Sequence, residues 1–276
     1  MKRICKKNLM YILTLCVACV CIYPIFIAVS TSFKTNQEIS QSVMALPKAM
    51  NFDNYVSAIE RSDFIRSLIN TCIVTFPSVA LIVVCGSMGG YTIARNSYQR
   101  KSFRIFDKIY LASLMIPFQI MMVPVYKIYK TLRLQNSLFG MILILTGTSV
   151  AYATFMYVGF VKSIPKELEE AAEIDGCGPY KTFFRIVLPL LKPVTATVAA
   201  LHVLWLWNDF NIAIIILQKE EVRTLTVKQF YFFDQYATEY GLAFASAIFS
   251  MIPVLIFFIF AQRYLIEGVS AGAVKN

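Results

Sequence analysis

Charged residues are scarce in this sequence. Only 15% of its 276 residues are Asp, Glu, Lys or Arg, whereas 58% are hydrophobic and the mean hydropathy is +0.62. A soluble protein of this length needs polar side chains to cover its exterior, and long apolar runs leave too few of them. We therefore expect most of the surface to face lipid rather than water.

Histidine and acidic residues within the apolar segments are also scarce. His202 is the only histidine, so no HExxH metal site can form, and we expect His202 to be packed and hydrogen-bonded. Asp209 is essentially the only charged residue inside the apolar segments. A membrane-embedded enzyme would need a nucleophile, a base or a metal cluster, and an ion-coupled transporter would need charges in its spans. We predict no enzyme activity, no metal and no cofactor.

Six apolar segments are long enough, or nearly so, to cross a bilayer core of about 30 Å, which needs roughly 20 helical residues. The sequence therefore predicts an all-α polytopic membrane protein with six transmembrane helices. Pro117 and Pro124 predict a kink in the third span. The first run is too long for the core of a signal peptide, so we expect it to stay in the membrane. The predicted spans are Leu9 to Ser30, Leu68 to Ala94, Ile109 to Tyr126, Leu138 to Val161, Val194 to Leu217 and Leu242 to Tyr264.

The net charge of +10 is distributed between the spans. Basic residues cluster in the connections rather than along one helix face, which is a signal of membrane topology rather than of nucleic-acid binding. They are most numerous at 2–7, 95–108 and 162–192, and this bias predicts a multi-pass protein with both termini in the cytoplasm. The cluster Lys127, Lys130 and Arg133 in a short external connection weakens the bias.

The connection between the fourth and fifth spans, residues 163–193, is the most informative stretch. Ser163 predicts a helix N-cap, and Glu167, Glu169 and Glu170 place negative charge near the positive end of that helix. Gly176 is placed to end the helix in a left-handed conformation, and a second helix is expected near Tyr180. An exposed, acidic helix with a small apolar face has the form of an element that fits a partner's groove. The residues alone nevertheless favour a solvated loop helix that has no partner.

The spacing of this connection resembles the EAA motif of the permeases of binding-protein-dependent ABC importers. Glu170, Ala171 and Ala172 are followed, after three residues that include Asp175, by Gly176, and then after nine more by Ile186, Leu188 and Pro189. Cys177 stands where the family more often has Ala. The likeness extends toward the carbohydrate-uptake branch, the maltose-type second permease, through Ser163-Ile164-Pro165, Trp207-Asn208-Asp209-Phe210, Asn51-Phe52-Asp53-Asn54-Tyr55 and the ending 271–275.

This resemblance implies an ABC type I importer permease fold and a set of partners. The connection would dock in a cleft of a separate ABC ATPase subunit, and a second permease subunit would form a heterodimer with this one. Two ATPase subunits would sit below the pair, and an extracytoplasmic solute-binding protein would deliver sugar. The location implied is a bacterial inner membrane. The chain has no G-x-x-x-x-G-K-[ST] loop to cradle phosphates, so ATP would be bound by the partner subunits. The residues implied in ATPase coupling are Glu170, Ala171, Ala172, Asp175, Gly176, Ile186, Leu188 and Pro189.

We divide the chain into residues 1–66, a transmembrane helix with an external loop, and residues 67–276, a core of five helices. The external loop could contact a partner or could cap the membrane domain. No appended soluble domain is expected.

Trp205, Asn208 and Asp209 are candidates for the substrate path, because aromatic rings stack on sugars while amides and carboxylates bond hydroxyls. Their spacing predicts one shared helix face. Helix-to-helix bonding and contact with the sister permease remain open for them. Gln119 is a further candidate, and Gly86, Gly89 and Gly90 predict close helix packing. The alternative functions are a permease for a polyol phosphate such as glycerol phosphate and an ATP-independent secondary transporter.

Overall fold

The computed structural model describes residues 2–236 and 239–273, with side chains described from 10 to 264 within those ranges. Residues 274 and 275, which belong to the predicted C-terminal likeness, lie outside them. The chain divides into two compact units, Met1–Ile65 with Lys228–Pro253, and Arg66–Val227 with Val254–Asn276. Each unit is described by itself.

The first unit contains α1 (Lys2–Ser32), α2 (Asn36–Gln41) and α3 (Asp53–Ser62), together with most of α13 (Leu225–Gln235) and the start of α14 (Tyr240–Ala273). Its core is formed by Ala58, Phe232, Leu242 and Ala245. The Asn51 side chain accepts a hydrogen bond from the Asp53 backbone N–H at 2.8 Å, which forms a turn directly before α3.

Gly241 marks the closest approach within this unit. A Cβ atom there would lie 2.5 Å from the carbonyl oxygen of Lys34, so only glycine fits without a shift. The Asn54 amide donates to the same carbonyl and to that of Ser32, both at 2.9 Å. The first turn of α14 is thereby packed against the segment that follows α1.

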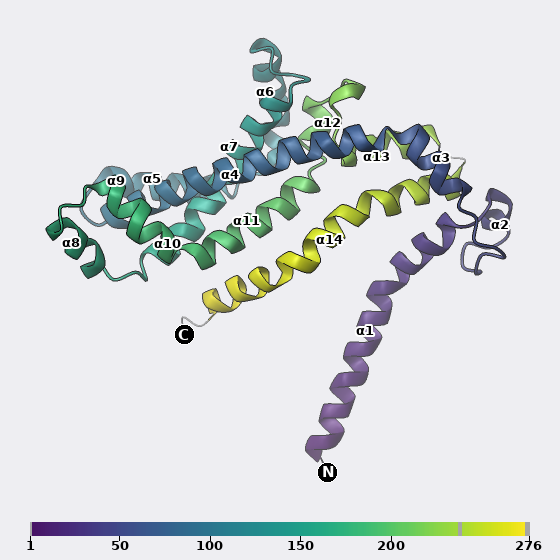
Figure 1. Cartoon of the computed structure of the whole chain (residues 1–276), viewed down its shortest axis with the longest axis horizontal. Coiled ribbons are helices and arrows are strands. Elements are labelled where there is room, and N and C mark those ends of the chain that lie inside the picture. Colours follow the sequence, from purple (N-terminus) through teal and green to yellow (C-terminus); the bar gives the residue numbers. More distant parts are fainter. Residues whose placement is uncertain (1, 237–238, 274–276) are drawn as a thin grey trace. The chain divides into compact units, whose positions relative to one another are not determined.

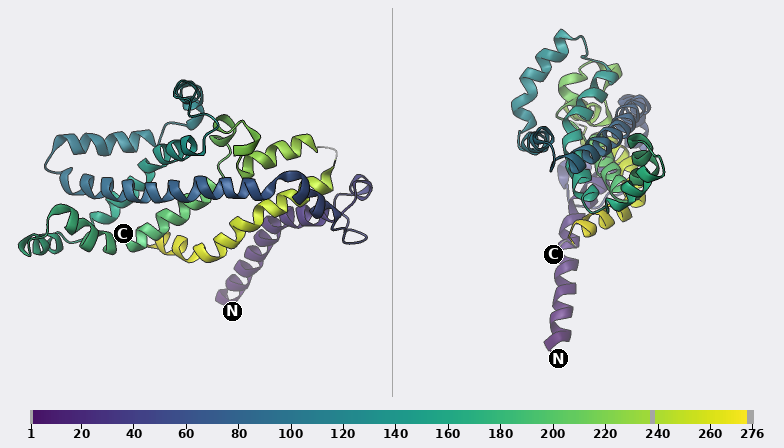
Figure 2. Two further views of the ribbon diagram at one scale, coloured as in Figure 1. Left: turned by 45° about the horizontal axis from the view of Figure 1, so that its top comes forward. Right: turned by 90° about the vertical axis from the view of Figure 1, so that its left-hand side faces the viewer.

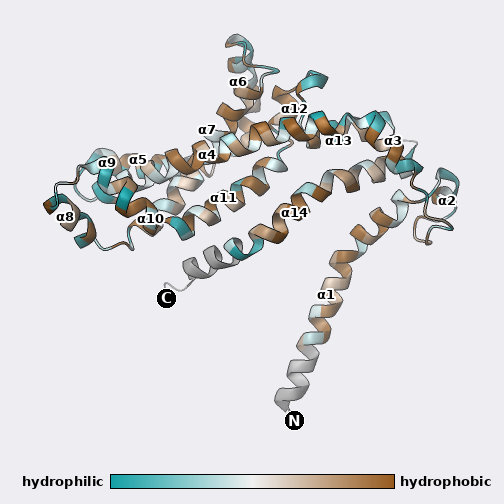
Figure 3. Cartoon of the chain, in the orientation of Figure 1, coloured by the Kyte–Doolittle hydropathy of each residue, from teal (hydrophilic) through white to brown (hydrophobic). Residues whose placement is uncertain are grey.

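The second unit is built on α4 (Phe64–Asn96) and α7 (Leu138–Val161), which are long apolar helices (Figures 1 and 2). The short helices α8 to α10 follow α7 and lie near the C-terminal end of α4. Figure 3 shows hydrophobic residues along the middle of α4 and hydrophilic ones in the connections. The remaining elements are α5 (Lys101–Ser113), α6 (Phe118–Thr131), α8 (Glu167–Ile174), α9 (Pro179–Thr182), the π-helical turn η1 (Phe183–Val187), α10 (Leu188–Leu190), α11 (Lys192–Trp207), α12 (Ala213–Ile216) and the 3-10 turn η2 (Glu220–Val222).

Glycines bring α4 and α7 into close contact, as predicted. A Cβ atom at Gly86 would lie 2.8 Å from the Ala153 Cβ, and one at Gly90 would lie 2.5 Å from the Tyr157 Cβ. At Gly89 the nearest atom would be 3.6 Å away, which is ordinary contact. Two of the three glycines therefore set the distance between the helices.

Four described helices are long and apolar enough to span a membrane: Met10–Ser32, Phe64–Asn96, Leu138–Val161 and Tyr240–Tyr264. Two bent pairs raise the number to six if each pair is one span, namely Lys101–Ser113 with Phe118–Thr131 and Pro179–Leu190 with Lys192–Trp207. The all-α membrane fold and four of the predicted spans are therefore confirmed within a few residues.

The third and fifth predicted spans need correction. The third is not a kinked helix but two helices bent by 103°, because the chain breaks at 114–117 and Pro117 becomes the N-cap of α6. The fifth does not continue to Leu217, since α11 ends at Trp207.

Candidate functional site

The helix α8 ends as the sequence predicts. Gly176 has φ +78°, and the Cys177 N–H donates to the Ala172 carbonyl at 2.9 Å, which closes the helix through a left-handed residue. The predicted start was wrong. The Ser163 hydroxyl donates back to the Phe160 carbonyl at 2.7 Å, so it completes the end of α7, and α8 begins only at Glu167.

A charged pair fastens α8 to α4. The Arg95 Nε donates to the Glu169 carboxylate at 2.8 Å, and the Tyr91 hydroxyl donates to its other oxygen at 2.8 Å. Arg95 also donates to the Ile164 carbonyl at 2.9 Å. Only 13% and 12% of the Arg95 and Glu169 side chains are exposed, so solvent screens the pair weakly. The first turn of α8 is therefore tied to the last turn of α4.

Sequence analysis missed this contact. Arg95 was counted only as a topology signal and Glu169 only as one of three acids near a helix start. The two residues are far apart in sequence, and no short motif links them. Apolar periodicity could have shown that Arg95 lies in the last turn of α4, but not which acid it meets.

The rest of the connection turns sharply back into the membrane domain. Phe183 and Val187 in η1 are buried, Ile186 and Leu188 are half-buried, and Pro189 is exposed. Pro189 lies in the first turn of α10, and the chain bends by 76° between Pro179–Leu190 and α11. Ile186, Leu188 and Pro189 therefore lie in a bent, partly buried segment that connects α8 to α11.

The other face of α8 is exposed. Glu170, Ala171 and Asp175 are exposed, whereas Ala172 is only 3% exposed and points into the fold. Large apolar side chains in and after α8 are exposed too, namely Ile174 at 88% and Tyr180 of α9 at 73% exposure. Exposed apolar side chains rimmed by acids are typical of a surface that a partner covers.

Three of the four path candidates lie at or just after the end of α11. Trp205 is half-exposed, and its ring lies edge-on to Tyr152 of α7 with 5.0 Å between centroids. His202 is fully buried, and its Nδ1 lies 2.7 Å from the Val198 carbonyl, which agrees with the expected packed histidine. Asn208 is exposed and donates to the Leu204 carbonyl at 2.8 Å.

The prediction that Trp205, Asn208 and Asp209 share one helix face was wrong for Asp209, because the helix stops before it. The Asp209 carboxylate accepts from the Ala213 N–H at 3.0 Å, and its carbonyl accepts from the Thr226 hydroxyl at 2.7 Å. Asp209 therefore stabilises the turn after α11. Gln119 lies in the first turn of α6 and is exposed, on a helix separate from the other candidates.

Metal ligands are not grouped in the described ranges 2–236 and 239–273, where no cluster of three or more His, Cys, Asp or Glu side chains occurs.

The fold and these surfaces define a polytopic membrane protein with a short exposed helix between two of its spans. Residues 82–270 match the family described as binding-protein-dependent transport system inner membrane component. The chain belongs to this family.

Relatives and solved structures agree with the match. The chain is 38% identical over 278 residues to the melibiose/raffinose/stachyose import permease protein MelC of Bacillus subtilis, covering 99% of this chain and all of that one. It is 36% identical over 272 residues, 98% of each chain, to the probable starch degradation products transport system permease protein AmyC of Thermoanaerobacterium thermosulfurigenes. Its fold matches a chain of a bacterial ABC transporter involved in alginate import, with TM-score 0.81, 23% identity and coverage of 94% and 95%.

Proposed function

We propose that this chain is a permease subunit of an ATP-driven importer that moves a sugar, an oligosaccharide in particular, into the cytoplasm. MelC and AmyC are named for the transport of sugars and of starch degradation products, which favours a sugar over a polyol phosphate. Membership of a binding-protein-dependent family argues against an ATP-independent secondary transporter. The chain itself is a transport subunit rather than an enzyme.

The exposed face of α8 is the proposed contact with the ATPase subunits. The observation that carries this proposal is that one face of α8 is attached and the other is exposed. Glu169 is bound to Arg95 of α4, whereas nothing in the described part of the chain covers Glu170, Ala171 and Ile174. Movement of a partner against α8 would pass to α4 through Glu169 and to α11 through η1 and α10. This requires α8 to face the cytoplasm and both termini to lie there.

Partners complete the proposal. A second permease, two ATPase subunits and an extracytoplasmic solute-binding protein would assemble with this chain. An alginate transporter structure that this fold also matches, with TM-score 0.73 and 19% identity, is described as a complex with a periplasmic protein bound to a pentasaccharide. We keep as a proposal that residues 67–276 carry the transport core and residues 1–66 an added helix and external loop.

The sugar path would include the face of α11 that carries Trp205 and Asn208. An indole ring half-exposed beside Tyr152 offers a stacking surface, and an exposed amide one turn later offers hydrogen bonds to hydroxyl groups. Asp209 and Gln119 remain candidates, with Asp209 already bonded to the backbone. Trp205→Ala is expected to raise the KM for uptake about three- to tenfold while the complex stays assembled. An unchanged KM would remove Trp205 from the path.

The test of coupling uses variants of the exposed face of α8. Glu170→Lys or Gly176→Asp should abolish uptake of labelled sugar while the protein still inserts, since the first reverses a charge and the second places a side chain at φ +78°. The wild-type complex should co-purify with ATPase subunits, and both variants should lose them. Glu221→Lys, an exposed charge reversal in η2, is the matched control and should keep both. Normal accumulation of sugar in either α8 variant at normal expression would contradict the proposal.

A further inference from the structure

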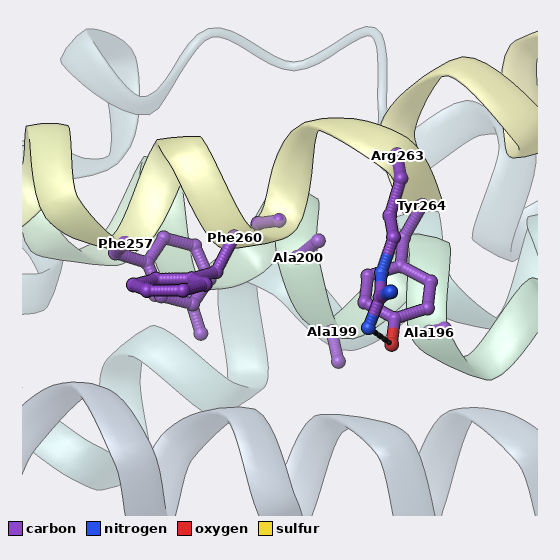
Figure 4. A pocket seen from close by; sticks show the side chains of 9 residues that line it. Ala196, Ala199, Ala200, Phe257, Phe260, Arg263 and Tyr264 are labelled. Carbon is purple, nitrogen blue, oxygen red and sulfur yellow. Dashed lines mark hydrogen bonds between the residues drawn. The ribbon is translucent and has the colours of Figure 1, made fainter.

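An open groove of about 410 Å³ lies between α11 and α14 of the second unit (Figure 4). Its apolar part is lined by Ala199 and Ala200 of α11 and by Phe257 and Phe260 of α14. Arg263 and Tyr264 stand at its other end. The groove is thus apolar along most of its length and cationic at one end.

The small side chains of α11 create the groove. Ala196, Ala199 and Ala200 recur at helical spacing, so the strip of α11 that they form carries only methyl side chains, and Val203 lines the groove beyond them. The rings of Phe257 and Phe260 form the facing wall. A narrow strip with aromatic walls accepts a flexible hydrocarbon chain, and neither helix offers a polar group along it.

The cationic end offers donors to an anion. The Arg263 Nη2 donates to the Tyr264 hydroxyl at 2.7 Å, and the guanidinium carbon lies 4.6 Å from the Tyr264 ring centroid. In the described part of the chain the ion pairs are Arg61 with Glu239 and Arg95 with Glu169, so Arg263 has no carboxylate partner there. A guanidinium has five N–H donors, and the tyrosine O–H remains free to donate as well.

Arg263 stands where the apolar part of α14 ends. The candidate span runs from Tyr240 to Tyr264, and the groove lies beside the first turns of α11, which begins at Lys192. Arginine and tyrosine at the end of a span lie at the level of lipid headgroups. The apolar part of the groove then extends from that level into the hydrocarbon region.

We propose that this groove binds one anionic phospholipid, with its phosphate on Arg263 and Tyr264 and an acyl chain along the alanine strip of α11. Charge complementarity selects the occupant, because a guanidinium that has no carboxylate partner among the side chains described up to residue 264 gains charge-assisted hydrogen bonds from a phosphate. Basic pockets between transmembrane helices are known to hold such headgroups. The inference does not depend on the transported solute. The bound lipid would fill the space between α11, which continues from the α8–α10 connection, and α14.

The test measures lipid retained by the assembled transporter. The complex is purified in a mild detergent, mixed with phosphatidylglycerol or phosphatidylcholine, and analysed by native mass spectrometry. We expect tight binding of about one phosphatidylglycerol per copy of this chain and at least tenfold weaker binding of phosphatidylcholine. Arg263→Gln should weaken phosphatidylglycerol binding about tenfold. Ala199→Phe, which fills the groove and keeps the charge, should abolish it.

Lys162→Gln is the matched control, since it removes an exposed positive charge next to the last turn of α7. It should leave lipid binding unchanged. Equal binding of both lipids, or equal loss in Lys162→Gln and Arg263→Gln, would overturn the proposal in favour of unspecific charge attraction. Inorganic phosphate that displaces the lipid, or a photo-crosslinker at Ala199 that captures a protein helix instead of lipid, would overturn it as well. Sugar uptake in the Lys162→Gln complex verifies assembly independently of the lipid.

Discussion

The two ends of the second unit are held together by different chemistry. At the α8 end, one ion pair between side chains, Arg95 with Glu169, fastens the exposed connection to α4. At the opposite end, neutral side chains bond the backbone: the Asn70 amide donates to the carbonyls of Glu221 and Arg223 at 3.0 and 3.1 Å, and the Thr71 hydroxyl accepts from the Leu225 N–H at 3.0 Å.

This difference indicates that the α8 end can move more easily than the opposite end, which we call the fixed end. Three bonds from α4 to the backbone of 221–225 fix the path of the chain itself, because each must break for that segment to move. At the α8 end, Tyr91 and Arg95 both bond the single Glu169 carboxylate, and only one bond, from Arg95 to the Ile164 carbonyl, reaches the backbone. We therefore expect substitutions at the α8 end to uncouple transport without unfolding the protein, and substitutions at the opposite end to reduce stability.

Breaking the ion pair should give the largest effect. Arg95→Met removes the cationic partner of the Glu169 carboxylate, which is mostly buried. The unpaired charge should weaken the free energy that attaches α8 to α4 by about 3 kcal/mol. Uptake should fall more than tenfold while membrane insertion and thermal stability change little. Adding Glu169→Leu to Arg95→Met should recover part of the activity, because two apolar side chains pack without a charge.

The same pair has a conservative variant as control. Arg95→Lys keeps the charge but cannot bond the Glu169 carboxylate and the Ile164 carbonyl with one planar group. Its uptake should lie between those of the wild type and Arg95→Met. If uptake by the Arg95→Met, Glu169→Leu double variant is no higher than uptake by Arg95→Met, the ion pair does more than hold α8 in place.

Substitution in the glycine contact of α4 and α7 should act on stability. Gly90→Ala places a Cβ 2.5 Å from the Tyr157 Cβ, which forces the helices apart and costs about 1–3 kcal/mol. Gly89→Ala, one residue away, places its Cβ in ordinary contact with the Thr154 Oγ1 at 3.6 Å, so it is the matched control and should be neutral. Thermal unfolding of the detergent-solubilised protein measures both. Equal stability of the two variants would contradict the packing described for α4 and α7.

Removing Asn70 should have an effect of similar size on stability, at the fixed end of the second unit, opposite to α8. Asn70→Ala leaves two backbone carbonyls without their donor, which should cost about 1–3 kcal/mol and lower the midpoint of thermal unfolding. Uptake per folded transporter should be preserved. A loss of uptake at unchanged stability would show that this end, too, moves during transport.

A pH effect in the first unit should be smallest. The backbone N–H groups of Thr35 and Lys48 donate to the Glu38 carboxylate and hold its pKa below the ordinary value of 4.5. Because the pKa is lowered in the folded state, the stabilisation that the Glu38 carboxylate gives to the loop between Thr35 and Lys48 is fully present above pH 4.5. It is lost as the pH falls through the lowered pKa. The protection of the Lys48 N–H against hydrogen exchange, taken relative to the intrinsic exchange rate at each pH, should therefore fall on acidification, and Glu38→Gln should remove that dependence.

Sequence patterns predicted the features that depend on local chemistry. Apolar length located α7 at Leu138–Val161, and the left-handed end of α8 followed from Gly176, since each depends on neighbouring residues alone. Composition could not show that the chain breaks after Trp207, because the segment to Leu217 is apolar apart from Asn208, Asp209 and Asn211. The helix ends where Asp209 bonds the backbone of the following turn.

Contacts between distant residues were not predictable in the same way. The pairing of Arg95 with Glu169 depends on how α4 and α7 cross, which the glycines at Gly86 and Gly90 set. The sequence predicted that these glycines allow close helix packing, but not which helix and which residues they contact. The sequence therefore predicted which segment forms the site, but only the structure shows that α8 is attached to α4 through Arg95 and Glu169.

Photo-crosslinking from α8 tests the central claim most directly. A photoreactive amino acid at Ile174, which is 88% exposed, would be irradiated in intact cells during sugar uptake. The account predicts that it captures an ATP-binding subunit, and that a membrane-impermeant thiol reagent added outside the cell does not label Ala171→Cys. Labelling of Ala171→Cys from outside, or capture of only an external protein, would contradict it.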